Sequence, residues 1–241
     1  MIKGSEKHSL PLLGELQFFT LIRRKRQKYI NLRVSFDGQL LVSAPVSASL
    51  KRIKAAVMNK QNWVKKHVRA MNQRYSDLYP LRALLFRGDT IKVTVNNDTK
   101  RKARVHHNEE VGTIVIHSRE ADPEVYHSAL KRWLTEKARL ELPGAVAAWA
   151  MRMDIDFNKL FIRNQKSRWG SSSDRGNISL NWRAIMVPKE VLEYLIVHEL
   201  AHQIHMDHSK TFWALVEHWS PDFRKWNAWL RKHAYLLAIL R

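Results

Sequence analysis

VPKEVLEYLIVHELAH, residues 187–202, is the stretch of this chain that decides its fold. Its apolar residues recur with a helical period, and Pro188 stands where a helix can begin, because proline is tolerated in a first turn. His198 and His202 are four residues apart, so they stand on one face of that helix, one turn apart. Their imidazoles can therefore converge on one metal ion, with Glu199 directed at a water bound to that ion.

The histidine content makes chance a real alternative, because the chain has 12 histidines in 241 residues. With this composition the pattern arises by chance with a frequency of about 3%. A structural zinc site normally has four protein ligands, often thiolates, but this chain has no cysteine. Histidine ligands with one open position for water are typical of a catalytic site. We therefore expect one catalytic zinc ion per chain rather than a surface helix with incidental histidines.

The third metal ligand is expected to be His208, six residues after the second histidine. Ser209 can cap a following helix, which leaves His208 in the connection between two helices, where it can fold back on the metal. His205 is the alternative ligand, or a solvent-exposed histidine at the helix end. Asp207 is either an acceptor for an imidazole N–H or an ordinary acid beside a helix.

Several further motifs give the chain a resemblance to the YgjP-like metallohydrolases. That family is of zincin type, close to the SprT-type proteins, and is regarded as a family of zinc metallopeptidases. The motifs in the second half are Arg168 to Ser173, Asn177 to Asn181, Pro188 to His202, His208-Ser209, Phe212-Trp213 and Pro221-Asp222. The first half contributes Ile30 to Val34, Asp37-Gly38, Ala44-Pro45 and a helix with Trp63. The family usually has a cysteine where this chain has Ser172, so we expect no thiol in the chemistry.

The resemblance implies roles for residues around the metal. Trp169, Gly170 and Asn181 lie in its motifs and are expected to line the cleft. Arg168 is expected either to hold an anionic group of the substrate or to brace the turn through a salt bridge. Glu199 is expected to be the general base, which takes a proton from the zinc-bound water, and not to be a ligand.

The net charge of +20 is concentrated in the first half of the chain. Residues 1–121 contain 24 Lys and Arg against 9 Asp and Glu, whereas residues 122–241 contain 18 against 13. Such density favours a nucleic acid or another polyanion as partner. The alternative is that the lysines and arginines form a solvated surface, since no known nucleic-acid motif accompanies them.

The pattern of apolar residues predicts an α+β protein with two domains. Residues 1–121 form a basic, β-rich N-terminal domain with one long helix over about residues 50–71, and Asp37-Gly38 is a hairpin signal. Residues 122–241 form a zincin-like catalytic domain. It begins with a helix capped by Asp122 and contains the metal helix and a small antiparallel sheet. Pro143-Gly144 predicts a kink or an end of the first helix, and no internal repeat is visible.

The most direct functional interpretation is a zinc metallopeptidase acting on a peptide. The resemblance also allows a metal-dependent nucleoside-triphosphate pyrophosphohydrolase acting on UTP, which Arg163, Lys166, Arg168 and the basic half would suit. A third interpretation is a nucleic-acid-associated, SprT-like protease. No run approaches the roughly 18 apolar residues of a membrane span, so no membrane partner is expected, and a cytoplasmic location is the default.

Overall fold

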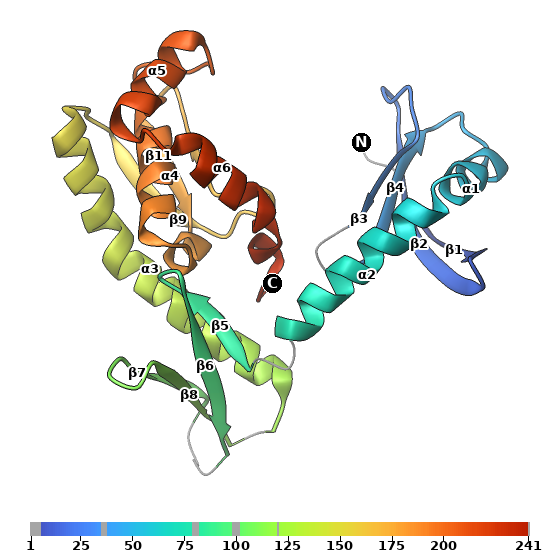
Figure 1. The fold of residues 1–241 in the computed structure, drawn as a ribbon, viewed down its shortest axis with the longest axis horizontal. Helices are drawn as coiled ribbons and strands as arrows, with labels where there is room; N and C mark the ends of the chain where they lie inside the picture. Colours follow the sequence, from blue (N-terminus) through green and yellow to red (C-terminus); the bar gives the residue numbers. More distant parts are fainter. Residues whose placement is uncertain (1–5, 35–37, 79–81, 98–101, 120, 241) are drawn as a thin grey trace. The chain divides into compact units, whose positions relative to one another are not determined.

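The computed structural model describes residues 6–34, 38–78, 82–97, 102–119 and 121–240, with the side chains of 71–78 excepted. It forms two compact units, residues 1–80 and 81–241. The described residues form helices together with three small mixed sheets, and one of the helices is long, so the expected α+β class is confirmed (Figure 1). The expected domain boundary between residues 121 and 122 falls inside the second unit, where strands before it pack on the helix after it.

Unit 1 has a four-stranded sheet covered by helices. The order is β1-β2-β4-β3, in which the central pair β2 and β4 is parallel and the outer pairs are antiparallel. Alternate residues of β4 are buried, as expected for a strand with one face on a core. Asp37, the first residue of the expected Asp37-Gly38 hairpin turn, lies outside the described residues. The bounds are β1 Glu6–Leu12, β2 Glu15–Arg24, β3 Asn31–Val34 and β4 Leu40–Pro45.

The helix expected over residues 50–71 is in fact two helices. α1 (Leu50–Met58) begins at the N-cap Ser49, and α2 (Gln61–Leu78) follows after a break at Asn59 and Lys60. Asparagine favours helix ends over helix interiors, because its side chain competes for backbone hydrogen bonds. Both helices still contribute to one core, since Ile53, Val57 and Val64 are fully buried against the sheet residues.

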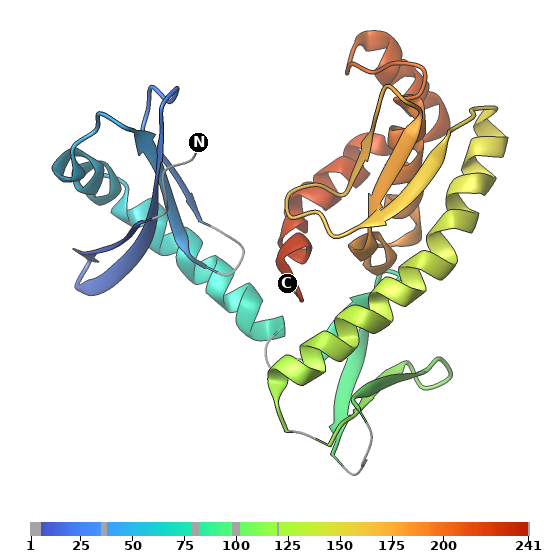
Figure 2. The ribbon, with the colours of Figure 1, turned by 180° about the vertical axis from the view of Figure 1, so that it is seen from behind.

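Unit 2 begins with a second four-stranded sheet of the same topology. Its order is β5-β6-β8-β7, again with a parallel central pair and antiparallel outer pairs, and again it is followed by a helix. β7 and β8 pack on that helix, α3 (Pro123–Met153), which is capped by Asp122 and continues through Pro143 (Figure 2). The strands are β5 Ala83–Phe86, β6 Asp89–Asn96, β7 Arg104–Asn108 and β8 Thr113–His117.

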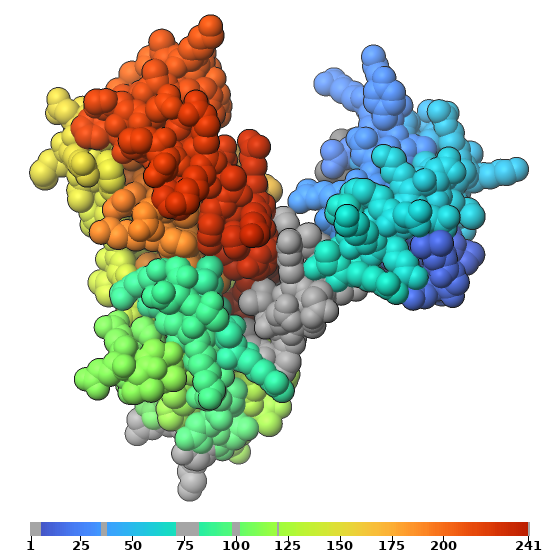
Figure 3. All heavy atoms as spheres, viewed as in Figure 1, coloured from blue at the N-terminus to red at the C-terminus, as the bar shows by residue number. Residues whose placement is uncertain are grey.

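The remainder of unit 2 surrounds a buried helix, α4 (Lys189–Ala201). A small sheet of order β10-β11-β9 lies beside it, and because β9 and β11 are parallel this sheet is mixed, not antiparallel as expected. α5 and α6 lie on the face of unit 2 that the space-filling view shows (Figure 3). The other bounds are β9 Lys159–Arg163, β10 Gly170–Ser172, β11 Asn177–Asn181, the 3₁₀ helix η1 Trp182–Met186, α5 Lys210–Trp219, α6 Phe223–Lys232 and η2 Ala234–Ala238.

The β5–β6 turn docks at the start of α4. The backbone N–H groups of Arg87 and Gly88 donate to the carbonyls of Ile185 and Met186, at 2.9 and 3.1 Å. Gly88 has φ +92°, and a Cβ there would lie 2.7 Å from the Cα of Pro188. Only glycine therefore fits this position. Among the described residues, no helix is long and apolar enough to cross a bilayer.

Candidate metal centre and hydrolytic site

The helix α4 is buried on nearly every side, which fixes the direction of its functional side chains. Apolar residues follow one another from Leu195 to Val197 and again at Leu200 and Ala201, and a helix that is apolar all round is a core helix. It packs against α3, α5, α6 and β10. His198, Glu199 and His202 therefore project from a rigid element rather than from a loop.

Three histidines meet at the end of α4 and form what we term the histidine triad: His198, His202 and His208. One imidazole nitrogen from each lies within 4.8 Å of the other two. The Nε2 atoms of His198 and His208 are 3.4 Å apart. Nitrogens bound tetrahedrally to one zinc ion at about 2.0 to 2.1 Å would be about 3.4 Å apart. The donor set therefore fits a metal ion, and Ser209 caps α5 directly after His208, as expected.

The surroundings of His202 favour coordination through its Nε2 atom. Its Nδ1 atom is 3.0 Å from the backbone carbonyl of His205, and a ligating histidine commonly donates its second N–H to such an acceptor. The ring stacks on Phe212 of α5, with centroids 4.4 Å apart, and Trp213 lies 5.5 Å from the ring of His208. The aromatic residues of α5 thus restrict the rotation of the imidazoles.

Burial keeps two histidines of the triad, His198 and His202, in the neutral state that binds metal. Burial, reinforced by the neighbouring His202 and His208, lowers the pKa of His198 to about 3. Burial also lowers the pKa of His202. Metal ions bind the neutral imidazole, so these two side chains need not lose a proton at neutral pH.

Glu199 is a buried carboxylate, with only 5% of its surface exposed. Burial raises its pKa to about 8, whereas the Ser172 hydroxyl and the charge of Arg168 act in the opposite direction. Its Oε2 atom has no hydrogen-bond partner in the part of the chain that the structure describes. A buried carboxylate oxygen without a partner is costly, and a nearby cation with its water would relieve that cost.

Strand β10 lies directly against Glu199. A Cβ on Gly170 would come within 2.8 Å of both Cγ and Cδ of Glu199, so no larger residue fits there without moving the carboxylate. The Ser172 hydroxyl donates to the Glu199 carbonyl at 2.6 Å and ties the strand to the helix. The contact of Ser172 was not anticipated, and its only sequence signal was its place in the Trp-Gly-Ser motif with Gly170.

The other motif residues brace the turn before β10. Asn181 is fully buried, and its side-chain amide donates to the carbonyls of Gln165 and Arg168, at 2.7 and 3.1 Å. Trp169 is also buried, and its carbonyl accepts from the Asn181 N–H at 2.7 Å. Arg168 itself is exposed, and no ion pair among the described residues includes it. Of the three residues expected to line the cleft, Gly170 contacts Glu199, whereas Trp169 and Asn181 are buried.

Two residues of the connection after α4 have contacts of their own. The Asp207 carboxylate accepts from the Ser209 N–H at 3.2 Å, and hydrogen bonds with the Ser209 side chain and backbone lower the pKa of Asp207. The structure thus pairs Asp207 with the start of α5, while the acceptor beside His202 is the carbonyl of His205. The His205 side chain is not part of the triad. Sequence reasoning could not identify a backbone carbonyl, because any residue supplies one.

Comparisons with known proteins agree with this geometry. No curated protein and no solved structure gave a significant match. One family model, described as YgjP-like, metallopeptidase domain, matches residues 28–233, which is most of the chain and includes the whole histidine triad. This match supports a metal-dependent hydrolase. The chain belongs to the YgjP-like family of metallopeptidase domains.

Proposed function

We propose that the protein is a zinc metallopeptidase in which the histidine triad binds one zinc ion per chain. The observation that carries the proposal is the convergence of three imidazoles, with the buried carboxyl group of Glu199 next to His198 in the chain. The three neutral imidazoles would hold the ion, which would supply a Lewis acid that lowers the pKa of water toward about 7 and polarises a carbonyl. Three protein ligands leave one coordination position open, which is typical of catalytic zinc.

Glu199 is the general base of this proposal. Its unpartnered Oε2 atom takes a proton from the attacking water and then passes it to the leaving amine. Burial raises the pKa of Glu199 to about 8 in the metal-free protein, and the positive charge of a bound zinc ion would favour the ionised carboxylate that accepts a proton. Gly170 and Ser172 hold the carboxylate and the end of α4 in position.

A peptide substrate is favoured by the position of β10. In the order β10-β11-β9 it is the edge strand of its sheet, and it packs against α4. An edge strand has unpaired backbone groups on one side, to which an extended peptide can add as a further strand. Such a peptide would lie next to Glu199, because Gly170 of this strand contacts that residue.

A second candidate is hydrolysis of a nucleoside triphosphate such as UTP. The observation in its favour is Arg168, an exposed cation without an ion-pair partner among the described residues, whose charge acts on Glu199. An arginine in this position could bind a phosphate. A peptide needs no such cation, so Arg168 distinguishes the two candidates.

One variant tests both candidates. Glu199→Gln should keep zinc and lower kcat/KM by at least about 10²-fold, because the amide cannot accept a proton. Glu190→Gln, at an exposed position of the same helix, is the matched control and should retain activity. Loss of peptide cleavage supports the peptidase. Loss of pyrophosphate release from UTP, with a further loss in Arg168→Ala, supports the second candidate, and activity that survives in Glu199→Gln contradicts the mechanism.

A further inference from the structure

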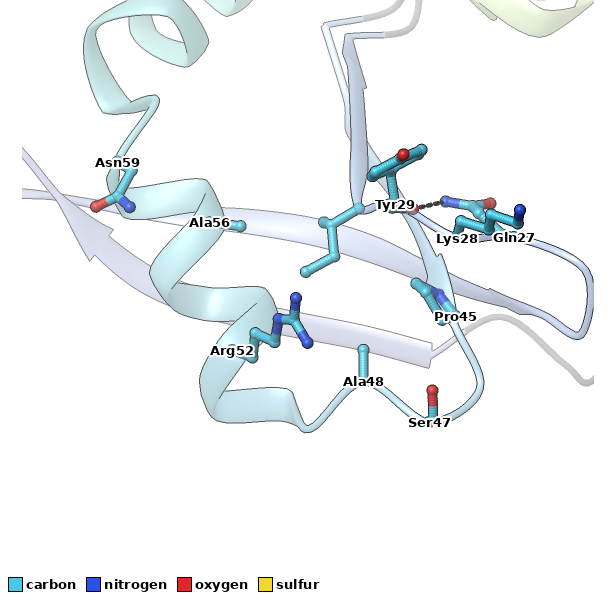
Figure 4. Close-up of a pocket in the computed structure, with 10 residues that line it drawn as sticks. Gln27, Lys28, Tyr29, Pro45, Ser47, Ala48, Arg52, Ala56 and Asn59 are labelled. Carbon is cyan, nitrogen blue, oxygen red and sulfur yellow. Dashed lines mark hydrogen bonds between the residues drawn. The ribbon is translucent and has the colours of Figure 1, made fainter.

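Unit 1 contains a groove of about 560 Å³ that has no part in the metal site (Figure 4). In Figure 4, α1 with Arg52 and Ala56, followed by its C-cap Asn59, forms one side, and the segment with Lys28 and Tyr29 lies opposite. Its volume is within the range of about 300 to 1,000 Å³ typical of ligand sites. We refer to it as the unit 1 groove.

Side-chain hydrogen bonds to the backbone hold both walls of the groove. The Gln27 amide donates to the Ser43 carbonyl at 2.6 Å and fixes the segment before Tyr29 to β4. The Arg23 guanidinium donates to the Ala48 carbonyl at 2.7 Å and fixes the connection between β4 and α1. The groove is therefore a built feature of the fold, not a gap beside a loose loop.

The charges around the groove are unbalanced. Residues 1–80 contain 16 Lys and Arg against 4 Asp and Glu, a net charge of +12. Of the carboxylates whose side chains are described, Glu6 pairs with His8 and Arg23, and Glu15 pairs with Lys65 and Arg69. Neither reaches the cations of the groove, Lys28 and Arg52, which are exposed and in no ion pair among the described residues. The groove is thus suited to an anion.

An exposed aromatic ring stands beside these cations. Tyr29 has 74% of its surface exposed, and no other ring of the described residues stacks on it. Gln27, Ser47 and Asn59 add polar groups to the same groove. Cations that follow a phosphate backbone, together with a ring on which a base stacks, are the features by which proteins bind single strands.

We propose that the unit 1 groove binds single-stranded nucleic acid, with Lys28 and Arg52 on phosphates and Tyr29 stacked on a base. A single strand is favoured over a duplex because the bases of a duplex are already stacked on one another and cannot cover Tyr29. Polar groups inside the groove favour a nucleotide over a membrane surface, which would require an apolar face. This site does not depend on the proposed hydrolase activity.

The test is fluorescence anisotropy of the full-length protein with a labelled oligothymidylate of about 12 nucleotides, at several salt concentrations. Lys28→Ala with Arg52→Ala should weaken binding at least about tenfold and reduce the log-log salt slope by about 1.4, since each phosphate contact contributes about 0.7. Tyr29→Ala should weaken binding at least about fivefold, whereas Tyr29→Phe, which keeps the ring, should bind like the wild type.

The matched control is Lys51→Ala with Lys60→Ala, which removes the same charge from exposed positions beside the groove. It should change the affinity less than about threefold. Equal losses of affinity in the two double variants would show that binding is diffuse and would overturn the proposal. An unchanged affinity in Tyr29→Ala would overturn it as well. Tighter binding of a duplex of the same length, or no binding at about 50 mM salt, would also overturn it. All these residues are exposed, so circular dichroism should show intact folding.

Discussion

Glu199→Gln is expected to stabilise the metal-free protein at alkaline pH while it inactivates the enzyme. The carboxylate is buried, and its pKa in the folded protein is about 8 against an ordinary value of 4.5. A group whose pKa is higher in the folded state contributes its full stability below the unfolded pKa and loses it as the pH rises through the folded pKa. The metal-free wild type should therefore become less stable between about pH 4.5 and pH 8.

The size of the effect follows from the difference between the two pKa values. They differ by about 3.5, and each unit corresponds to about 1.4 kcal/mol, so the loss above pH 8 is on the order of 3 to 5 kcal/mol. Glutamine carries no charge and should not lose this stability. For a protein of this size the variant should melt about 10 °C higher at alkaline pH.

Thermal unfolding of the metal-free proteins at about pH 5, 7 and 8.5 measures this difference. The gap between variant and wild type should widen as the pH rises and narrow when zinc is added, because the cation favours the charged carboxylate. The protonation of His198 affects the stability of both proteins alike, so it cancels from the difference between their melting temperatures. Glu190→Gln, which changes an exposed carboxylate, should show no such pH dependence. Equal melting temperatures of Glu199→Gln and wild type at every pH would refute the reasoning.

Alanine at any one position of the histidine triad should abolish tight zinc binding, measured by elemental analysis, because two imidazoles bind zinc too weakly. His205→Ala is the control and should keep the metal. Zinc retained in His208→Ala would contradict the assignment of His208 as a ligand. Gly170→Ala should keep zinc but lower turnover at least about tenfold, because the new methyl group displaces the Glu199 carboxylate. Gly88→Ala should destabilise the protein by about 2 to 4 kcal/mol in denaturant unfolding, through its positive φ and its contact with Pro188. Gly144→Ala, in open space on α3, is its control and should stabilise the protein by about 0.5 to 1 kcal/mol.

Local patterns in the sequence predicted the elements that carry the site. A period of 3.6 residues defined α4, the spacing of four placed His198 and His202 on one face, and Ser209 marked the start of α5. These features depend on interactions within one or two turns, which the sequence encodes directly. The break between α1 and α2 was missed because Val57 and Val64 continue the helical period across Asn59.

Longer-range features were decided by tertiary structure alone. The two four-stranded sheets share one topology although the sequence shows no repeat, because strand order depends on pairing between distant segments and not on a residue pattern. Strands β7 and β8 join unit 2 for a similar reason, since their pairing within the sheet of β5 and β6 and their packing on α3 assign them to it. The sequence placed the domain boundary at the helix cap Asp122, but a cap marks where a helix begins and does not determine which elements share a core.

The chemistry of the site divides in the same way. The sequence by itself determined the side-chain types, imidazoles for a metal and a carboxylate for the proposed base, because these chemical groups are properties of the residues themselves. Only the tertiary structure placed Gly170 and Ser172 of β10 against Glu199, and only burial in that structure moved the pKa of Glu199 to about 8. Residues that lie almost 30 positions apart in the chain meet only when strand and helix pack, and the desolvation that perturbs a carboxyl group arises from that packing.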